Sequence, residues 1–128
     1  MKLTFRWYGD SDPVTLDHIR QIPGMTGIVS AVYDVPAGGV WSEDSIAALK
    51  KKAQDKNLAF EVVESEPEPE DIKLGNDKAP QLIANYCENV RRLGKAGVKC
   101  ICYNFMPVID WLRSELEHPQ PDGANALA

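Results

Sequence analysis

The sequence is poor in residues and patterns on which several protein classes depend. It holds two histidines and three cysteines, and an odd cysteine count argues against a framework of disulfides. No apolar run approaches the ~20 residues of a membrane-spanning helix. Arg6 interrupts the N-terminal stretch in which a signal peptide would need its apolar segment. We therefore expect a cytoplasmic protein that makes no membrane contact.

Clustered positive charge is also scarce. The formal net charge is −5 and the pI is about 5.0. The one basic run, Lys50 to Lys52, falls in a helical pattern with Glu43, Asp44 and Asp55 nearby. This pattern indicates a solvated helix face rather than a phosphate-binding patch. The charge distribution argues against a nucleic-acid partner.

The chain does contain the composition of one globular domain. Its 128 residues are 44% hydrophobic and 26% charged, which are ordinary globular values. A chain of this length buries roughly two thirds of its unfolded surface.

Four segments are rich in β-branched and aromatic residues, as strands are, and helical patterns lie between them. Thr15 and Ser42 are placed to cap the first two helices, and Asn57 and Gly97 to end the second and third. The predicted strands are residues 3–8, 27–33, 59–64 and 98–105. The predicted helices run over 16–21, from Ser42 to Asn57, and from Pro80 to Gly97.

This alternation of strands and helices contains nothing that resembles a hairpin turn. It predicts an α/β fold with right-handed crossovers and a parallel sheet. In such sheets the functional side chains gather at the carboxyl ends of the strands.

The acidic run at residues 64–71, ESEPEPED, alternates Glu with Pro. It lacks the spacing and the glycine of a calcium-binding loop. We interpret it as an extended, solvated loop.

The string KCICYNFMP places Cys100, Cys102 and Asn104 on one side of the predicted fourth strand. Two thiols on one strand could ligate a metal or serve a redox role, but no second Cys or His cluster lies nearby. Free cysteine also behaves as a small buried hydrophobe. We favour buried packing for both thiols and place Asn104 at the rim.

Several strings then occur together in the order and spacing of one family. They are FRWYG (5–9), DPVTL (12–16), AVYDVP (31–36), VWS (40–42), VVES (62–65), EDIK (70–73), IANY (83–86), CYNFMPVIDW (102–111) and PDG (121–123). The chain resembles the N-terminal part of mannonate dehydratase, a (β/α)8 TIM-barrel enzyme of glucuronate catabolism. The resemblance covers nearly the whole chain, so we expect residues 1–128 to form a single segment, the N-terminal half of a TIM barrel.

The resemblance implies a lyase that dehydrates D-mannonate to 2-keto-3-deoxy-D-gluconate with Mn2+ or Fe2+. It also implies that the metal ligands and the acid–base residues lie on later strands. We therefore expect no catalytic residue and no metal ligand in this segment, no metal bound by the segment alone, and no activity of the segment alone. The partner is the sugar acid, and we expect a homo-oligomer or completion by the rest of the barrel.

Five residues at the strand ends are candidate substrate contacts, and each has a structural alternative. Arg6 could hold the substrate carboxylate, and Trp7 could cover the sugar chain or fill the core. Glu64 could bind hydroxyls or form a salt bridge. Asn104 could donate to a hydroxyl or cap a turn. Tyr33, with its neighbour Asp34, presents the same choice.

One position departs from the family pattern. The resemblance implies a histidine where this chain has Pro69, and apolar residues in place of Glu66 and Glu68. If that histidine helps to bind substrate, its loss would weaken activity.

Other side chains and functions stay open. His18 is expected on the surface of the first helix and His118 in a loop. Trp111 and Arg113 could close over a site or belong to a subunit contact. The alternative functions are a sugar isomerase or epimerase of the xylose-isomerase-like group, and a non-catalytic fragment that binds a sugar acid or self-associates.

Overall fold

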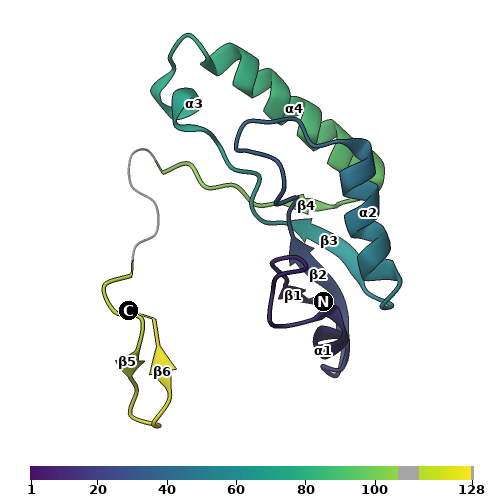
Figure 1. Cartoon of the computed structure of the whole chain (residues 1–128), viewed down its shortest axis with the longest axis vertical. Coiled ribbons are helices and arrows are strands. Elements are labelled where there is room, and N and C mark those ends of the chain that lie inside the picture. Colours follow the sequence, from purple (N-terminus) through teal and green to yellow (C-terminus); the bar gives the residue numbers. More distant parts are fainter. Residues whose placement is uncertain (107–112, 128) are drawn as a thin grey trace.

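The computed structural model describes residues 1–106 and 113–127, and four of its strands form one parallel sheet in the order β1-β2-β3-β4 (Figure 1). The sheet strands are β1 Leu3–Arg6, β2 Met25–Ser30, β3 Ala59–Val63 and β4 Cys100–Ile101. The helices are α1 Leu16–Arg20, α2 Glu43–Gln54, α3 Glu70–Leu74 and α4 Ala79–Ala96, and a small hairpin pairs β5 His118–Pro119 with β6 Asn125–Ala126. The predicted α/β fold with a parallel sheet is confirmed.

The expected capping residues hold the helix ends. Ser42 Oγ accepts a hydrogen bond from the backbone N–H of Ser45 at 2.9 Å, which satisfies a donor that the first turn of α2 leaves free. Asn57, with φ of 58°, turns the chain out after α2 in the left-handed conformation. Gly97 ends α4 with φ of 92°, a value that favours glycine because it has no Cβ.

Helices α2 and α4 lie side by side over one face of the sheet (Figure 1). The apolar side chains of that face are buried against them, and each such side chain stabilises the fold by roughly 1.5–3 kcal/mol. The core contains Ile28, Phe60 and Val63 of the sheet, Ile46, Leu49 and Ala53 of α2, Leu93 of α4, and Trp7, Ile19 and Trp41 from the flanking segments.

The other face of the sheet is much less covered. The register places Arg6 beside Val29 and Val62 beside Cys100, and none of these four residues is fully buried. A register shift after Ile28 leaves Glu61 as an extra residue in β3, as in a β-bulge. The charged and thiol side chains of the sheet therefore gather on the face that α2 and α4 do not cover.

The strand boundaries differ from the predicted ones. The second strand starts at Met25 and ends at Ser30, so that Tyr33 lies in the following loop. The fourth strand covers Cys100–Ile101 only, instead of 98–105. The reason is that β4 pairs with β3 alone, and the backbone N–H of Asn104 bonds to the carboxylate of Glu68 instead of to a strand.

The prediction of a wholly extended acidic loop is wrong in two respects. After a cis peptide bond between Glu64 and Ser65, the chain buries Glu66. It then forms α3, with Glu70 and Asp71 in the first turn, where carboxylates stabilise a helix.

The expectation of no hairpin is also wrong. Gln120 and Ala124 close a turn between β5 and β6, with the Gln120 N–H donating to Ala124 O at 2.8 Å. Gly123 supplies the positive φ that this turn requires. The string PDG is thus a turn signal, and the hairpin stands apart from the sheet in Figure 1.

The prediction that Cys100 and Cys102 are buried is wrong, because both are exposed. Their side chains lie on the face of the sheet that α2 and α4 do not cover, whereas Ile101 between them packs against the core. The predicted alternation is correct, since the two cysteines and Ile101 point to opposite faces of the sheet. The error is the assignment of the cysteines to the buried face.

Two smaller predictions are settled, and one residue lies outside the described part of the chain. His18 is exposed in α1, as expected. The expectation of a loop at His118 is wrong, because His118 lies in β5, where it is opposite Ala126 of β6, and its side chain pairs with Glu115. Trp111 falls outside the described residues. Among the described residues, no helix is long and apolar enough to cross a membrane.

Candidate functional site

Two of the predicted site residues meet in an ion pair at the carboxyl ends of β1 and β3. Arg6 Nη1 lies 2.8 Å from Glu64 Oε2. The guanidinium also lies over the ring of Tyr8, 4.7 Å from its centroid, a contact that favours a cation. Parallel strands bring these residues together, since their carboxyl ends share one edge of the sheet.

The Arg6–Glu64 pair is reachable from solvent and retains unused donors. The side chain of Arg6 is 25% exposed and that of Glu64 is 49% exposed. Arg6 Nε is buried and has no hydrogen-bond partner among the described residues. A guanidinium that uses one edge for a protein carboxylate can present other N–H groups to an anion.

The thiol of Cys102 lies close enough to Arg6 and Glu64 for both charges to affect its pKa. Burial of part of its side chain raises the thiol's pKa, and the nearby Cys100 and Glu64 raise it further, whereas Arg6 lowers it. The thiol is therefore largely protonated at neutral pH, although the residue as a whole is exposed. This environment does not generate a reactive thiolate.

Trp7 and Tyr33 form a second, separate group. The Trp7 carbonyl oxygen accepts hydrogen bonds from Ser30 Oγ at 2.7 Å and from Tyr33 Oη at 3.3 Å. The Trp7 side chain is only 4% exposed and belongs to the core. Because Arg6 and Trp7 are consecutive in an extended segment, their side chains leave on opposite sides.

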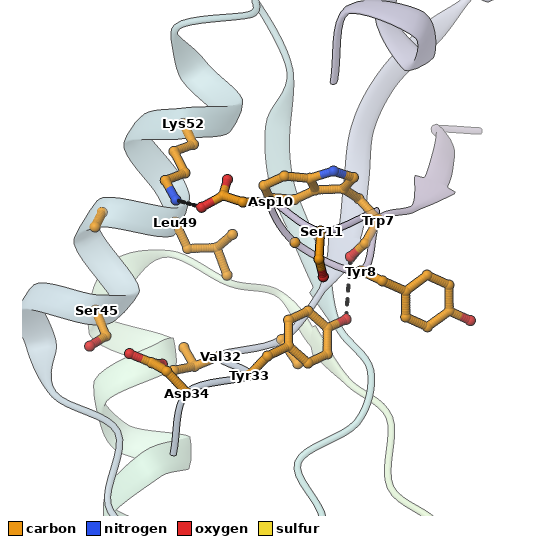
Figure 2. A pocket seen from close by; sticks show the side chains of 13 residues that line it. Trp7, Tyr8, Asp10, Ser11, Val32, Tyr33, Asp34, Ser45, Leu49 and Lys52 are labelled. Atoms are coloured by element: carbon orange, nitrogen blue, oxygen red, sulfur yellow. Dashed lines mark hydrogen bonds and ion pairs between the residues drawn. The ribbon is translucent and has the colours of Figure 1, made fainter. Parts of the chain in front are cut away.

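The second group lines a cavity of about 490 Å³ between the β1–α1 loop, the segment after β2 and α2 (Figure 2). Lys52 Nζ and Asp10 Oδ2 pair at 2.5 Å across its edge, and Asp34 and Ser45 add polar atoms to the opposite part of its lining. The cavity offers an aromatic wall with hydroxyl and carboxylate groups, a combination suited to a polyol.

The backbone N–H of Asn104 bonds to a residue that belongs to neither group. Its backbone N–H donates to Glu68 Oε2 at 3.3 Å, and it is partly buried. This bond ties the segment after β4 to the segment after β3. The structure therefore brings Arg6 together with Glu64, and Trp7 together with Tyr33.

A buried polar cluster was missed by the sequence analysis. Asn89 of α4 is 2% exposed. Its Oδ1 accepts from the Trp41 N–H at 2.8 Å, and its Nδ2 donates to Gly39 O at 3.0 Å and to Glu66 Oε1 at 2.7 Å. Asn89 has polar neighbours along α4, so the sequence does not distinguish it from an exposed asparagine and does not predict these buried hydrogen bonds.

Glu66 has an unusual environment for a carboxyl group. Burial raises its pKa to about 7, the hydrogen bond from Asn89 opposes that rise, and Glu68 adds to it. Burial also raises the pKa of Tyr86, beside Glu66 and Glu68. Pro69, which stands where the family resemblance implies a histidine, shares a small cavity with Glu66.

The described residues do not fit a metal centre. Among residues 1–106 and 113–127, no group of three or more His, Cys, Asp or Glu side chains is placed to hold a metal ion. Two thiols and one carboxylate near an arginine lack the donor set that Mn2+ or Fe2+ requires.

Parallel strands joined by helices on one face, with charged side chains at the strand ends, define the chain as part of a TIM-barrel-type α/β enzyme. The sequence model of the D-mannonate dehydratase (UxuA) family matches residues 1–128. The chain belongs to the D-mannonate dehydratase family, as the resemblance implied.

Individual relatives agree in sequence and in structure. A mannonate dehydratase of Streptococcus suis is 54% identical over 128 residues, which are 100% of this chain and 35% of that protein. One from Oceanobacillus iheyensis is 54% identical over 127 residues, 99% of this chain and 36% of that protein. The crystal structure of mannonate dehydratase from Streptococcus suis serotype 2 superposes with a TM-score of 0.96 at 54% identity, over 99% of this chain and 36% of that one. The chain thus spans about a third of the length of the relatives it matches.

Proposed function

We propose that this chain forms the first four strands of a mannonate dehydratase, a hydro-lyase that converts D-mannonate to 2-keto-3-deoxy-D-gluconate and water. The observation that carries the proposal is the match of the family over residues 1–128, together with 54% identity to curated mannonate dehydratases. A sugar isomerase or epimerase shares the barrel architecture but not this match.

Arg6 is the residue proposed to bind the carboxylate of the substrate. Its guanidinium is partly exposed at the strand ends, and Nε has no partner among the described residues. A carboxylate can be bound through two parallel N–H groups. Glu64, already beside Arg6, and Asn104 are proposed to bind hydroxyl groups of the sugar acid.

Trp7 and Tyr33 are proposed to contact the substrate on the other side of β1. This role requires that the polyol reach the cavity of Figure 2, where both residues are part of the lining. The buried indole of Trp7 would then act as a wall rather than as a hydrogen-bonding group.

The chemistry requires more than these residues. Removing the proton at C2 needs a base and a polarised carboxylate, and the C3 hydroxyl needs an acid to leave. The family implies a metal ion, with Mn2+ or Fe2+ as the proposed identity. Since the described residues do not fit a metal centre, we assign this chain substrate binding and no step through the metal.

The remaining proposals concern location and assembly. We propose a cytoplasmic protein in which further barrel strands or a second copy cover the free edges of β1 and β4, because unpaired strand edges tend to associate. Light scattering tests this: a monodisperse monomer of 14.2 kDa would contradict self-association.

The experiment that tests the reaction is an assay of the purified protein with D-mannonate and Mn2+, paired with an intact mass of the protein assayed. We expect no turnover by the 128-residue chain assayed alone, and the 2-keto-3-deoxy acid as product where the rest of the barrel is present; in that complete protein Arg6→Gln should raise KM more than it lowers kcat. The matched control is Arg91→Gln, because Arg91 is exposed on α4 and pairs with Glu88. An isomerised or epimerised sugar acid as product would overturn the proposal in favour of the isomerase group.

A further inference from the structure

Glu66 is a buried carboxyl group that forms no ion pair with any of the residues that the structure describes. The residue is 2% exposed, and its Oε1 accepts from Asn89 Nδ2 at 2.7 Å. Its Oε2 is buried and has no partner among the described residues. The cavity beside it measures about 10 Å³, which leaves room for one water molecule at most.

The contact with Asn89 joins three segments of the chain. Asn89 lies on α4, Gly39 and Trp41 precede α2, and Glu66 follows β3. The segments approach closely, because a Cβ added at Gly38 would lie 2.6 Å from Leu82 Cδ2 and 2.8 Å from Pro69 Cγ. Glu66 is therefore one of the side chains through which residues 64–69 bond to α4, and Glu68, which accepts from the Tyr86 hydroxyl, is another.

The groups around Glu66 offer it no positive charge. From its own segment it faces Glu68, whose Oε1 is also buried without a partner in the described part of the chain. From α4 it faces Tyr86, a titratable phenol, and Asn89. The segment before α2 contributes Gly39 and Trp41.

The basic group that bonds to Trp41 in this network is already engaged. Arg92 of α4 donates to Trp41 O at 2.8 Å and pairs with Glu88 at 2.9 Å. None of the ion pairs within residues 1–106 and 113–127 includes Glu66. An ionised Glu66 would thus be a buried anion beside a second carboxylate, a costly arrangement.

We propose that Glu66 is a pH-dependent contact, which in its protonated form holds residues 64–69 against Asn89 of α4 and in its ionised form releases them. Glu64 belongs to the same segment, so release would also move the partner of Arg6. The proposal concerns this chain's conformation and does not depend on the proposed reaction.

The sign of the effect follows from linkage. The pKa of Glu66 is about 7 in the closed structure and 4.5 in its ordinary state. Between these values an opened segment has lost the proton and the closed one has kept it, so opening becomes more favourable as pH rises. The opening equilibrium constant should increase about tenfold between pH 6 and pH 8, and change little above that.

Amide hydrogen exchange of Ser65, Glu66 and Glu68 tests the proposal. After correction for intrinsic exchange rates, we expect the opening equilibrium of these amides in the wild-type chain to rise about tenfold from pH 6 to pH 8. Glu66→Gln retains an acceptor for Asn89 and cannot ionise, so its opening should not depend on pH. Glu43→Gln is the matched control: Glu43 is an exposed partner of Lys95, and its variant should keep the wild-type response.

Two results would overturn the proposal. One is a pH response in Glu66→Gln equal to that of the wild type, and the other is a wild-type segment whose opening is independent of pH. If Glu66→Gln does not fold, carboxyl ¹³C NMR of the wild-type chain decides. A midpoint for Glu66 near 7 supports the proposal, and a midpoint near 4.5 refutes it.

Discussion

A glutamate beside the open face of the sheet and a glutamate under the helices differ in exposure and in hydrogen-bond partner. Glu64 and Glu66 are two residues apart, yet the side chain of Glu64 is 49% exposed and paired with Arg6 at 2.8 Å. Glu66 is 2% exposed, and its carboxyl group accepts from the neutral amide of Asn89. On the open face the carboxylate is paired with a guanidinium, whereas under the helices burial raises the pKa of the Glu66 carboxyl to about 7.

The difference separates the part of the chain that stabilises the fold from the part whose polar groups are accessible to a ligand. Under α2 and α4, apolar packing and a neutral hydrogen-bond cluster hold the layers together. On the open face, charged groups and thiols stay accessible. Substitutions of matched residues on the two faces should therefore lower the free energy of unfolding by unequal amounts.

The largest effect is expected for a pair of neighbours in β2. Ile28 is fully buried under the helices, whereas Val29 is partly buried on the open face beside Arg6. Ile28→Ala should cost about 3 kcal/mol of unfolding free energy, because it leaves a cavity. Val29→Ala should cost about 1 kcal/mol. Urea unfolding at pH 6 measures both, and equal costs would mean that the open face is packed as tightly as the covered one.

The next effect concerns two asparagines one turn apart in α4. Asn89→Ala leaves the Trp41 N–H, the Gly39 carbonyl and the Glu66 carboxyl without their partner, and should cost about 2–3 kcal/mol. Asn85 is only partly buried, and its amide donates to Gly38 O, so that Asn85→Ala should cost about 1 kcal/mol or less. Thermal unfolding at pH 6 gives the comparison, and a loss below 1 kcal/mol for Asn89→Ala would show that water replaces its contacts.

The fold was predictable from sequence because strand–helix alternation is a repeated, local signal. Segments rich in β-branched residues form strands, Ser42 caps the start of α2, and Gly97 ends α4, as expected. The short β4 was not predictable at its true length, because it depends on having a pairing partner on one side only. The turn at Gly123 had a local signal that was overlooked.

The candidate site was predictable only in part, for the same physical reason. Alternation correctly separated Cys100 and Cys102 from Ile101, but burial depends on which face other elements cover, and a single strand does not encode that. Likewise, an acidic run with prolines predicts a solvated loop. The burial of Glu66 depends on its contact with Asn89, which is distant in sequence. The Arg6–Glu64 pairing follows from the parallel topology once the strand ends are known.

A smaller effect is expected at the Arg6–Glu64 pair. Glu64→Gln and Arg6→Gln should each change the unfolding free energy by less than about 1 kcal/mol, because the pair is screened by solvent. A double-mutant cycle in low and high salt should give a coupling below about 1 kcal/mol that weakens with salt. A coupling of several kcal/mol that salt does not change would place the pair in a dry environment and weaken the contrast with Glu66.

The smallest effect separates two exposed thiols. Cys87 lies on α4 and Cys102 on the open face of the sheet, and both are exposed. Partial burial and its neighbours Cys100 and Glu64 raise the pKa of Cys102, so that less of it is thiolate at pH 7.5. Single-cysteine variants lack Cys100 but keep the partial burial and Glu64, so a thiol-specific disulfide reagent should still modify Cys102 more slowly than Cys87, and in urea the two rates should converge. Glu64→Gln removes one of the groups that raise the Cys102 pKa, and it should therefore speed the reaction of Cys102 and leave that of Cys87 unchanged. Equal native rates for the two thiols would mean that the open face imposes no electrostatic cost on a second anion beside Glu64.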